Sequence, residues 1–126
     1  MRIEVSQLPP IEYSPNWRGH WRQRYQAGEV YKSAVYYSCV DARNRALAKG
    51  RLVFMRARLN LTFVFPQSRR RDEDNLIARF KPGLDGIVDS GLVVDDDAEH
   101  LEIVGVGIQA DKERAPLTII ELEEWK

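Results

Sequence analysis

Two clusters of acidic residues are the part of this 126-residue sequence that could do chemistry. The first is Asp72-Glu73-Asp74, which follows directly after three arginines, and the second is Asp95-Asp96-Asp97. Carboxylates from two separated segments are typical of Mg²⁺ sites in phosphoryl-transfer enzymes, because the ion takes few protein oxygens and keeps several waters. The spacing therefore favours a metal site that joins the two segments.

The first cluster can serve one cation only in a particular backbone conformation. Side chains two positions apart share a face of an extended chain but lie on nearly opposite faces of a helix. Asp72 and Asp74 therefore converge on one ion only if their segment is extended or looped. Pro66 and the arginine run upstream favour that conformation.

A simpler interpretation of each cluster stays open. Aspartate and asparagine before a helix are common N-caps, and a run of aspartates in a loop is most often solvated. An EF-hand fits poorly, since counting from Asp72 places Ile77 where that loop needs glycine and Gly83 where it needs glutamate. Neither histidine has metal-ligand spacing to the other or to the single cysteine, so we expect no zinc site.

Positive charge is concentrated in the first half of a chain whose net charge is zero. Residues 1–71 contain 14 Lys and Arg against 4 Asp and Glu, a net of +10. Residues 72–126 contain 5 against 15, a net of −10. This asymmetry favours a nucleic-acid partner, because phosphate contacts need local basic surface and not a basic total. Mutual neutralisation of the two halves within the fold is the alternative.

Two groups of basic residues are the candidate DNA contacts. The group beside the first acidic cluster, where it would offset the repulsion between phosphates and carboxylates, consists of Arg69, Arg70 and Arg71. The other group interleaves arginines with aromatic residues and consists of Trp17, Arg18, Trp21, Arg22 and Arg24. That pattern suits stacking on unpaired bases, but for the tryptophans we favour ordinary packing onto the sheet.

The elements that must position these residues belong to the α+β class. The clearest strand spans residues 51–65, where apolar and polar residues alternate before Pro66. An apolar spacing from Leu76 to Val88 predicts a helix after the acidic cluster, with a kink or a division into two short helices at Pro82-Gly83.

The other predicted elements flank these two. A helix over residues 28–49, ended by Gly50, would bury an apolar face of Val30, Val35, Cys39 and Ala46. The remaining strands are expected at residues 2–7, 101–109 and 117–122, with a hairpin loop over residues 111–114 between the last two. We therefore expect one α+β domain over residues 1–126, a mixed sheet of three to five strands with about two helical segments.

The composition is ordinary for a soluble globular protein, with 44% hydrophobic and 30% charged residues. Cys39 is the only cysteine, so no intramolecular disulfide is possible. No apolar run approaches the roughly 20 residues of a membrane span, and the first four residues lack the apolar core of a secretory signal. We expect a cytoplasmic protein with no membrane partner.

The acidic clusters also belong to a wider motif. It comprises Arg70-Arg71-Asp72-Glu73-Asp74-Asn75-Leu76, then Lys81-Pro82-Gly83-Leu84-Asp85, then Gly91-Leu92-Val93-Val94-Asp95-Asp96. This stretch resembles the RusA family of Holliday junction resolvases, whose pattern reads R-R-D-x-D-N-L, K-x-x-x-D and G-x-x-x-D-D. Ser14-Pro15-Asn16-Trp17 is similar to a loop near the N-terminus of that family. The resemblance is dense over residues 70–99 and diffuse elsewhere, and it implies a RusA-like fold.

The resemblance implies a role for each matching residue. Asp72, Asp74 and Asp96 would be the catalytic carboxylates that bind Mg²⁺, for which Mn²⁺ could substitute. Lys81, four residues before Asp85, would be the catalytic lysine. This chain carries about three extra residues before that lysine, so Arg79 is the alternative cation. The supporting residues would be Asn75, which orients the loop or caps the helix, and Asp95.

The resemblance also implies a substrate and a partner. A resolvase nicks four-way DNA junctions symmetrically, leaving 5′-phosphate and 3′-hydroxyl ends, and it does so as a homodimer encoded by a bacterium or phage. Three other functions stay open: a metal-dependent nuclease for other branched DNA, a non-catalytic DNA-binding protein, and a module that binds a protein partner through its charged halves.

Overall fold

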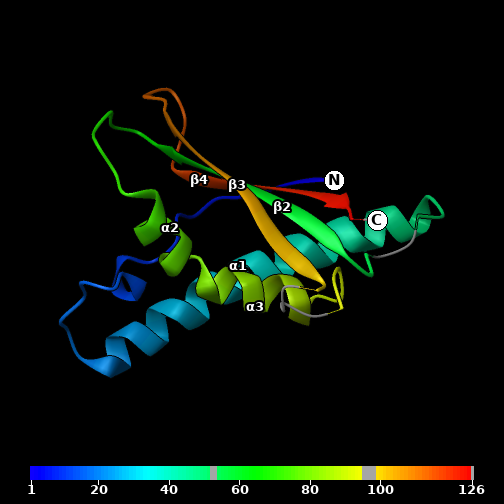
Figure 1. Cartoon of the computed structure of the whole chain (residues 1–126), viewed down its shortest axis with the longest axis horizontal. Helices are drawn as coiled ribbons and strands as arrows, with labels where there is room; N and C mark the ends of the chain where they lie inside the picture. The colour runs from blue at the N-terminus through cyan, green and yellow to red at the C-terminus, as the bar shows by residue number, and fades with distance from the viewer. Residues whose placement is uncertain (52–53, 95–98, 126) are drawn as a thin grey trace.

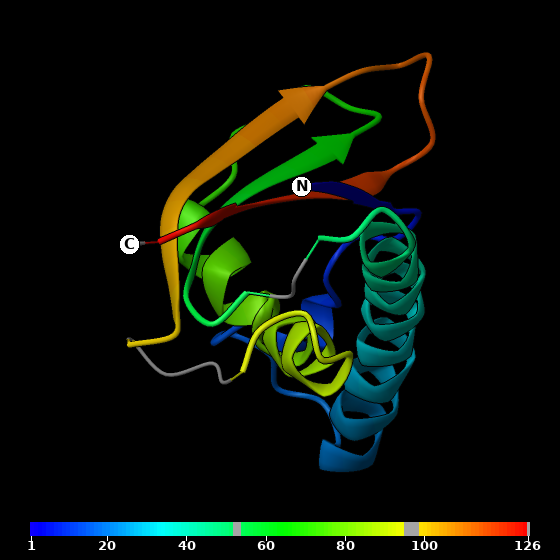
Figure 2. The ribbon, with the colours of Figure 1, turned by 90° about the vertical axis from the view of Figure 1, so that its right-hand side faces the viewer.

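A four-stranded mixed sheet lies on one side of the molecule, and the helices pack against a single face of it (Figures 1 and 2). The computed structural model describes residues 1–51, 54–94 and 99–125. The helices in this part of the chain are a 3-10 turn η1 (Ile11–Tyr13), α1 (Trp21–Ala48), α2 (Glu73–Arg79) and α3 (Lys81–Asp89). The strands are β1 (Arg2–Val5), β2 (Ala57–Phe65), β3 (Leu101–Ala110) and β4 (Leu117–Glu124). The expected α+β class and the single mixed sheet are confirmed.

The strand order is β1-β4-β2-β3. β2 pairs in parallel with β3 and antiparallel with β4, which also pairs antiparallel with β1. The prediction of a hairpin between the last two strands was wrong, because β2 lies between β3 and β4. Their connection instead crosses the end of β2, where the N–H of Asp111 donates to the carbonyl of Phe65 at 2.9 Å.

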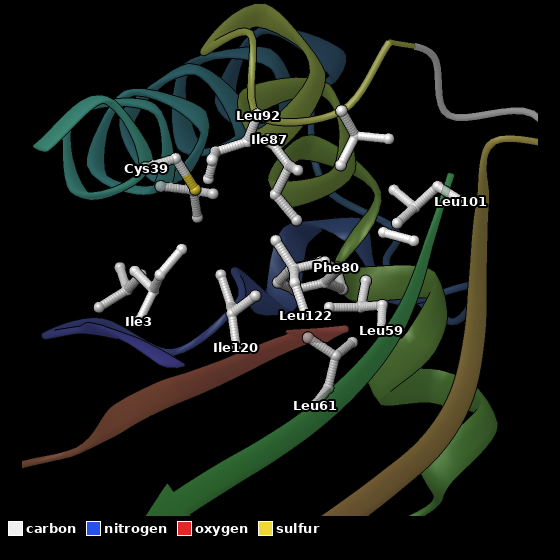
Figure 3. Packing of buried hydrophobic residues seen from close by; sticks show 14 of the residues in the cluster. Ile3, Cys39, Leu59, Leu61, Phe80, Ile87, Leu92, Leu101, Ile120 and Leu122 are labelled. Atoms are coloured by element: carbon white, nitrogen blue, oxygen red, sulfur yellow. The ribbon is translucent and has the colours of Figure 1, made fainter. Parts of the chain in front are cut away.

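The apolar residues that alternate with polar ones along β2 face the core, as the sequence predicted. Leu59, Leu61 and Phe63 of β2 are fully buried. They pack in one cluster with residues of β4, α1, α2 and α3, among them Ile120, Leu122, Cys39, Phe80 and Ile87 (Figure 3). The strand itself starts at Ala57 and not at residue 51, and Phe54 before it makes only an isolated bridge to Val93.

α1 is longer than predicted and buries a slightly different face. It begins at Trp21, seven positions before the predicted start, and ends at Ala48 before Gly50, whose φ of 76° confirms the expected stop. Val30 was wrongly placed in its apolar face, because it is 61% exposed. The buried positions are Gly28, Tyr31, Val35, Cys39, Ala42 and Ala46, spaced three or four residues apart.

The segment after the acidic cluster forms two short helices that meet at Phe80. Division into two helices was one of the two expected outcomes, and the break lies slightly before the Pro82-Gly83 pair. Pro82 stands in the first turn of α3, where the missing N–H of proline costs no hydrogen bond. Within the described residues, no helix is both long and apolar enough to cross a membrane.

Candidate functional site

Asp72 marks the point where the chain turns into α2. Its backbone is extended, with φ −91° and ψ 118°, and its Oδ1 accepts hydrogen bonds from the N–H of Asp74 at 2.9 Å and of Asn75 at 3.4 Å. This is N-capping of the kind that the sequence left open. The expectation of an extended or looped segment holds for Asp72 but is wrong for Asp74, which lies in the first turn of the capped helix.

The two aspartates nevertheless face the same hollow. Asp72 and Asp74 are both exposed, and with Glu73, Arg70 and Arg71 they line an open surface depression of about 670 Å³. The side chain of an N-cap residue folds back over the first helical turn, which brings Asp72 towards a residue two positions on. The cap thus brings the Asp72 carboxylate to the backbone N–H of Asp74, and both residues line one hollow although Asp74 is helical.

The second acidic cluster, with Asp95 and Asp96, lies outside the described residues. On either side of it, Val93 bridges to Phe54 and Leu101 pairs with Ala57, so both flanks lie beside the beginning of β2. Asp72 instead follows the end of that strand. Among residues 1–51, 54–94 and 99–125, no group of three His, Cys, Asp or Glu side chains is placed to hold a metal ion. Asp96 as a third carboxylate stays a prediction.

The three arginines before the cluster differ in their surroundings. Arg71 is half-buried, with its guanidinium 3.6 Å from the centre of the Phe65 ring, and it donates to the carbonyls of Gln67 and Arg69 at 3.1 Å each. Desolvation, followed by the charge of Arg69, lowers the pKa of Arg71. Arg71 thus holds the loop of residues 67–71 against Phe65 at the end of β2. Arg69 and Arg70 are exposed.

The two alternative cations also occupy different environments. Arg79 is half-buried and donates from Nη2 to the carbonyl of Pro9 at 2.6 Å, and desolvation lowers its pKa. It therefore ties α2 to the chain that leads into η1. Lys81 is exposed at the start of α3, and its Nζ lies 3.4 Å from Oδ1 of Asp85. Asn75 contributes its backbone N–H to the cap that Asp72 provides.

The aromatic residues near the N-terminus fall into two groups. Trp17 is half-buried, and its ring lies so close to Gly19 that an added Cβ there would be 2.1 Å away. Trp21 is 66% exposed on α1, so packing onto the sheet is wrong for this tryptophan. Tyr25, 58% exposed, was missed from the sequence, although its spacing of four residues from Trp21 would have placed it on the same helical face.

Comparison with known proteins yields one bacterial relative and no activity. No family model matches the chain. A protein of Xylella fastidiosa (strain Temecula1 / ATCC 700964), described as uncharacterized, is 42% identical over 90 residues, which make up 70% of this chain. The chain spans 56% of the length of that curated relative. These comparisons do not bear on the resemblance to the RusA family.

Proposed function

We propose that the protein is a Mg²⁺-dependent endodeoxyribonuclease of the RusA type that resolves four-way DNA junctions by paired nicks. The observation that carries the proposal is the hollow at the start of α2, where the exposed carboxylates of Asp72 and Asp74 lie beside Arg70 and Arg71. Carboxylates that bind a cation and arginines that bind phosphate are the two groups that phosphodiester cleavage needs in one place.

The residues of the hollow fit a hard divalent cation. Within residues 1–51, 54–94 and 99–125, both hydrogen bonds that the Asp72 carboxylate accepts use Oδ1, which leaves Oδ2 for a ligand. Asp74 supplies a second exposed carboxylate, and Asp96 is proposed as the third from the resemblance. Mg²⁺ bound there would provide Lewis acidity that activates a water and offsets phosphate charge.

The cationic residues have separate proposed roles. In the part of the chain that the structure describes, the exposed side chains of Arg69 and Arg70 donate no hydrogen bond to the backbone, and we propose that they contact phosphates beside the carboxylates. Lys81 is the proposed catalytic cation, because Arg79 is already held by the Pro9 carbonyl. From its surface position Lys81 would stabilise charge that develops on the scissile phosphate. Arg18 and Arg22 are proposed to hold a more distant part of the DNA.

The choice of a branched substrate rests on the RusA-like motif, and the choice of nucleic acid also rests on the basic first half of the chain. Two cuts in strands related by a two-fold axis require two sites, so a homodimer is part of the proposal. The bacterial relative agrees with a bacterial or phage origin, and a cytoplasmic location is proposed because the DNA substrate lies there.

One assay tests the proposal. Purified protein is incubated with synthetic four-way, fork and linear duplex DNA of equal length, with Mg²⁺ and with EDTA, and the products are sized on denaturing gels. We expect symmetric nicks in the four-way substrate that need Mg²⁺ and can be resealed by a ligase. Cleavage of forks in preference to junctions would instead identify a nuclease for other branched DNA.

A non-catalytic DNA-binding protein is the second candidate, and the capping hydrogen bonds of Asp72 favour it. In that case the carboxylates serve only to start α2. The same assay would then show tight, salt-sensitive DNA binding without Mg²⁺-dependent nicks. Absence of any salt-sensitive DNA affinity would leave the protein-binding module as the remaining function.

A further inference from the structure

The first two turns of α1 extend beyond the part of the helix that packs on the fold. Residues 20–26 are all exposed, and the first buried position of the helix is Gly28. Figure 1 shows this end of α1 at the lower left, away from the sheet. We call residues 18–25, which include this helix end and the residues before it, the α1 tip. Its conformation is set locally, by the side chain of His20 capping the N–H of Arg22 at 3.0 Å.

The α1 tip presents two large aromatic rings to solvent. Trp21 is 66% exposed and Tyr25 is 58% exposed. Because they are four residues apart on a helix, they lie on one face, a single turn from each other. Single exposed hydrophobic residues are common on protein surfaces, but two adjacent aromatic rings on a helix end with no core beneath them form a platform.

The same segment is strongly basic. It carries Arg18, Arg22 and Arg24, and no acidic residue occurs anywhere in residues 13–28. In the described part of the chain, none of these arginines forms an ion pair. The guanidinium of Arg22 lies 5.7 Å from the centre of the Trp21 ring, and Arg24 stacks on Tyr13 at 4.2 Å. Positive charge therefore stands directly beside the exposed rings.

We propose that the α1 tip is a binding site for single-stranded DNA, in which Trp21 and Tyr25 stack on unpaired bases and Arg18 and Arg22 contact the phosphates. Stacking on aromatic rings together with a basic surface along the backbone is the general mode of single-strand binding. The choice of DNA as the nucleic acid rests on the proposed function, whereas the site and its chemistry rest on the exposed rings and the arginines.

The position of the tip fits unpaired nucleotides next to a branch point. η1, which leads into the tip, contacts α2, and Arg79 of α2 holds the carbonyl of Pro9 just before η1 at 2.6 Å. In Figure 1, α2 and η1 lie on the same side of the molecule as the start of α1. The chain that leads into the tip is thus tied to α2, the helix whose first turn lines the acidic hollow.

The test measures binding and not cleavage. The affinity for a fluorescent twelve-nucleotide oligothymidine is measured by anisotropy in EDTA at fixed low salt, for the wild type and for Trp21→Ala, Trp21→Phe and Tyr25→Ala. Since stacking contributes about 1–3 kcal/mol per base, we expect Trp21→Ala to weaken binding roughly 5-fold to 150-fold. Trp21→Phe keeps a ring and should retain most of the affinity.

The matched control is Tyr37→Ala. Tyr37 is a 69% exposed aromatic residue on the same helix, four turns further along and outside the basic segment. Its removal should leave the affinity for the oligonucleotide unchanged, and Trp21→Ala should change the affinity for a blunt twelve-base-pair duplex less than twofold. Circular dichroism confirms that each variant is folded.

Three results would overturn the inference: no oligothymidine binding by the wild type, wild-type affinity in Trp21→Ala, or an equal loss in Tyr37→Ala. A change in oligomeric state on Trp21→Ala with unchanged affinity would assign the tip to contact with a second copy of the chain. Because the assay contains no Mg²⁺, its outcome does not depend on nuclease activity. A protein that never nicks a junction could still bind the oligonucleotide through Trp21.

Discussion

Oδ1 of Asp72 accepts a hydrogen bond from the backbone N–H of Asp74 over 2.9 Å. The same residue therefore starts α2 and supplies a carboxylate to the hollow that Asp74 also lines. The observed cap and the proposed Mg²⁺ site make different demands on the Asp72 side chain. A cap needs only an oxygen acceptor, whereas a site for Mg²⁺ gains from the negative charge.

Substitutions at Asp72 separate these functions. Asp72→Asn keeps the acceptor and removes the charge, so we expect the free energy of unfolding to stay within about 0.5 kcal/mol of wild type while junction cleavage falls roughly 100-fold or more. Asp72→Ala should lose the cap as well, at about 1 kcal/mol. Urea unfolding and single-turnover cleavage provide the two measurements. Wild-type cleavage by Asp72→Asn would reduce Asp72 to a helix cap.

The two candidate cations can be distinguished in the same way. Lys81 is exposed and its ion pair with Asp85 contributes about 0–1 kcal/mol, so Lys81→Met should leave stability nearly unchanged and lower cleavage at least tenfold. Arg79→Met removes the bond to Pro9 and should cost about 1.5–3 kcal/mol of unfolding free energy. The reverse pattern, with active Lys81→Met and folded but inactive Arg79→Met, would assign the catalytic charge to Arg79.

The arginine run should show unequal effects on DNA affinity and loop order. For Arg70→Gln we expect the slope of log affinity against log salt to fall by about 0.9, the value for one phosphate contact, with unchanged hydrogen exchange in residues 66–71. For Arg71→Gln we expect faster exchange there, because the Phe65 contact and both carbonyl hydrogen bonds are lost. Arg45→Gln, at an exposed arginine paired with Asp41, is the control and should change neither quantity.

Burial of Cys39 links stability to alkaline pH. Desolvation raises the pKa of this thiol from its ordinary value of 9.0 to about 12. Below pH 9 the thiol is neutral in both states, so its contribution to stability is fully present. Between pH 9 and 12 the unfolded chain ionises first, and stability falls with a slope of up to about 1.4 kcal/mol per pH unit.

Urea unfolding at pH 7, 9 and 10 measures this effect. We expect the unfolding free energy of the wild type to decline more steeply above pH 9 than that of Cys39→Ala, which lacks the ionising group. Both proteins keep Tyr31, whose pKa is raised mainly by burial and least by the charge of Cys39, so most of the Tyr31 contribution cancels in the comparison. Equal pH dependence in the two proteins would contradict the attribution of the alkaline loss of stability to the buried thiol of Cys39.

Elements with a strong local pattern were predictable from the sequence. The alternation in β2 placed Leu59, Leu61 and Phe63 correctly in the core, and Gly50 correctly ended α1. Pairing between strands was not predictable in the same way. The loop at residues 111–114 reads as a hairpin because its strands are consecutive, and nothing local reveals that β2 is inserted between them.

The candidate site shows the same division. Its residues were predictable because a run of charged side chains precedes an apolar helical pattern. The helical conformation of Asp74 was not predictable, because it depends on capping of α2 by Asp72. The start of α1 was missed because residues 20–26 bury nothing and so carry no apolar period. Trp21 is exposed because the first turns of α1 extend beyond the packed part of the fold, and this extension is visible only in the structure.

The central claim is that the carboxylates at the start of α2 are catalytic, and Asp74→Asn tests it most directly. Among the described residues, Asp74 takes part in the cap through its backbone N–H and not through its side chain, so the substitution should leave the helix start intact. The measurement is single-turnover cleavage of a labelled four-way junction in Mg²⁺, with junction affinity measured in EDTA. We expect affinity within about threefold of wild type and no symmetric nicks. Nicking by Asp74→Asn at the wild-type rate would contradict the claim.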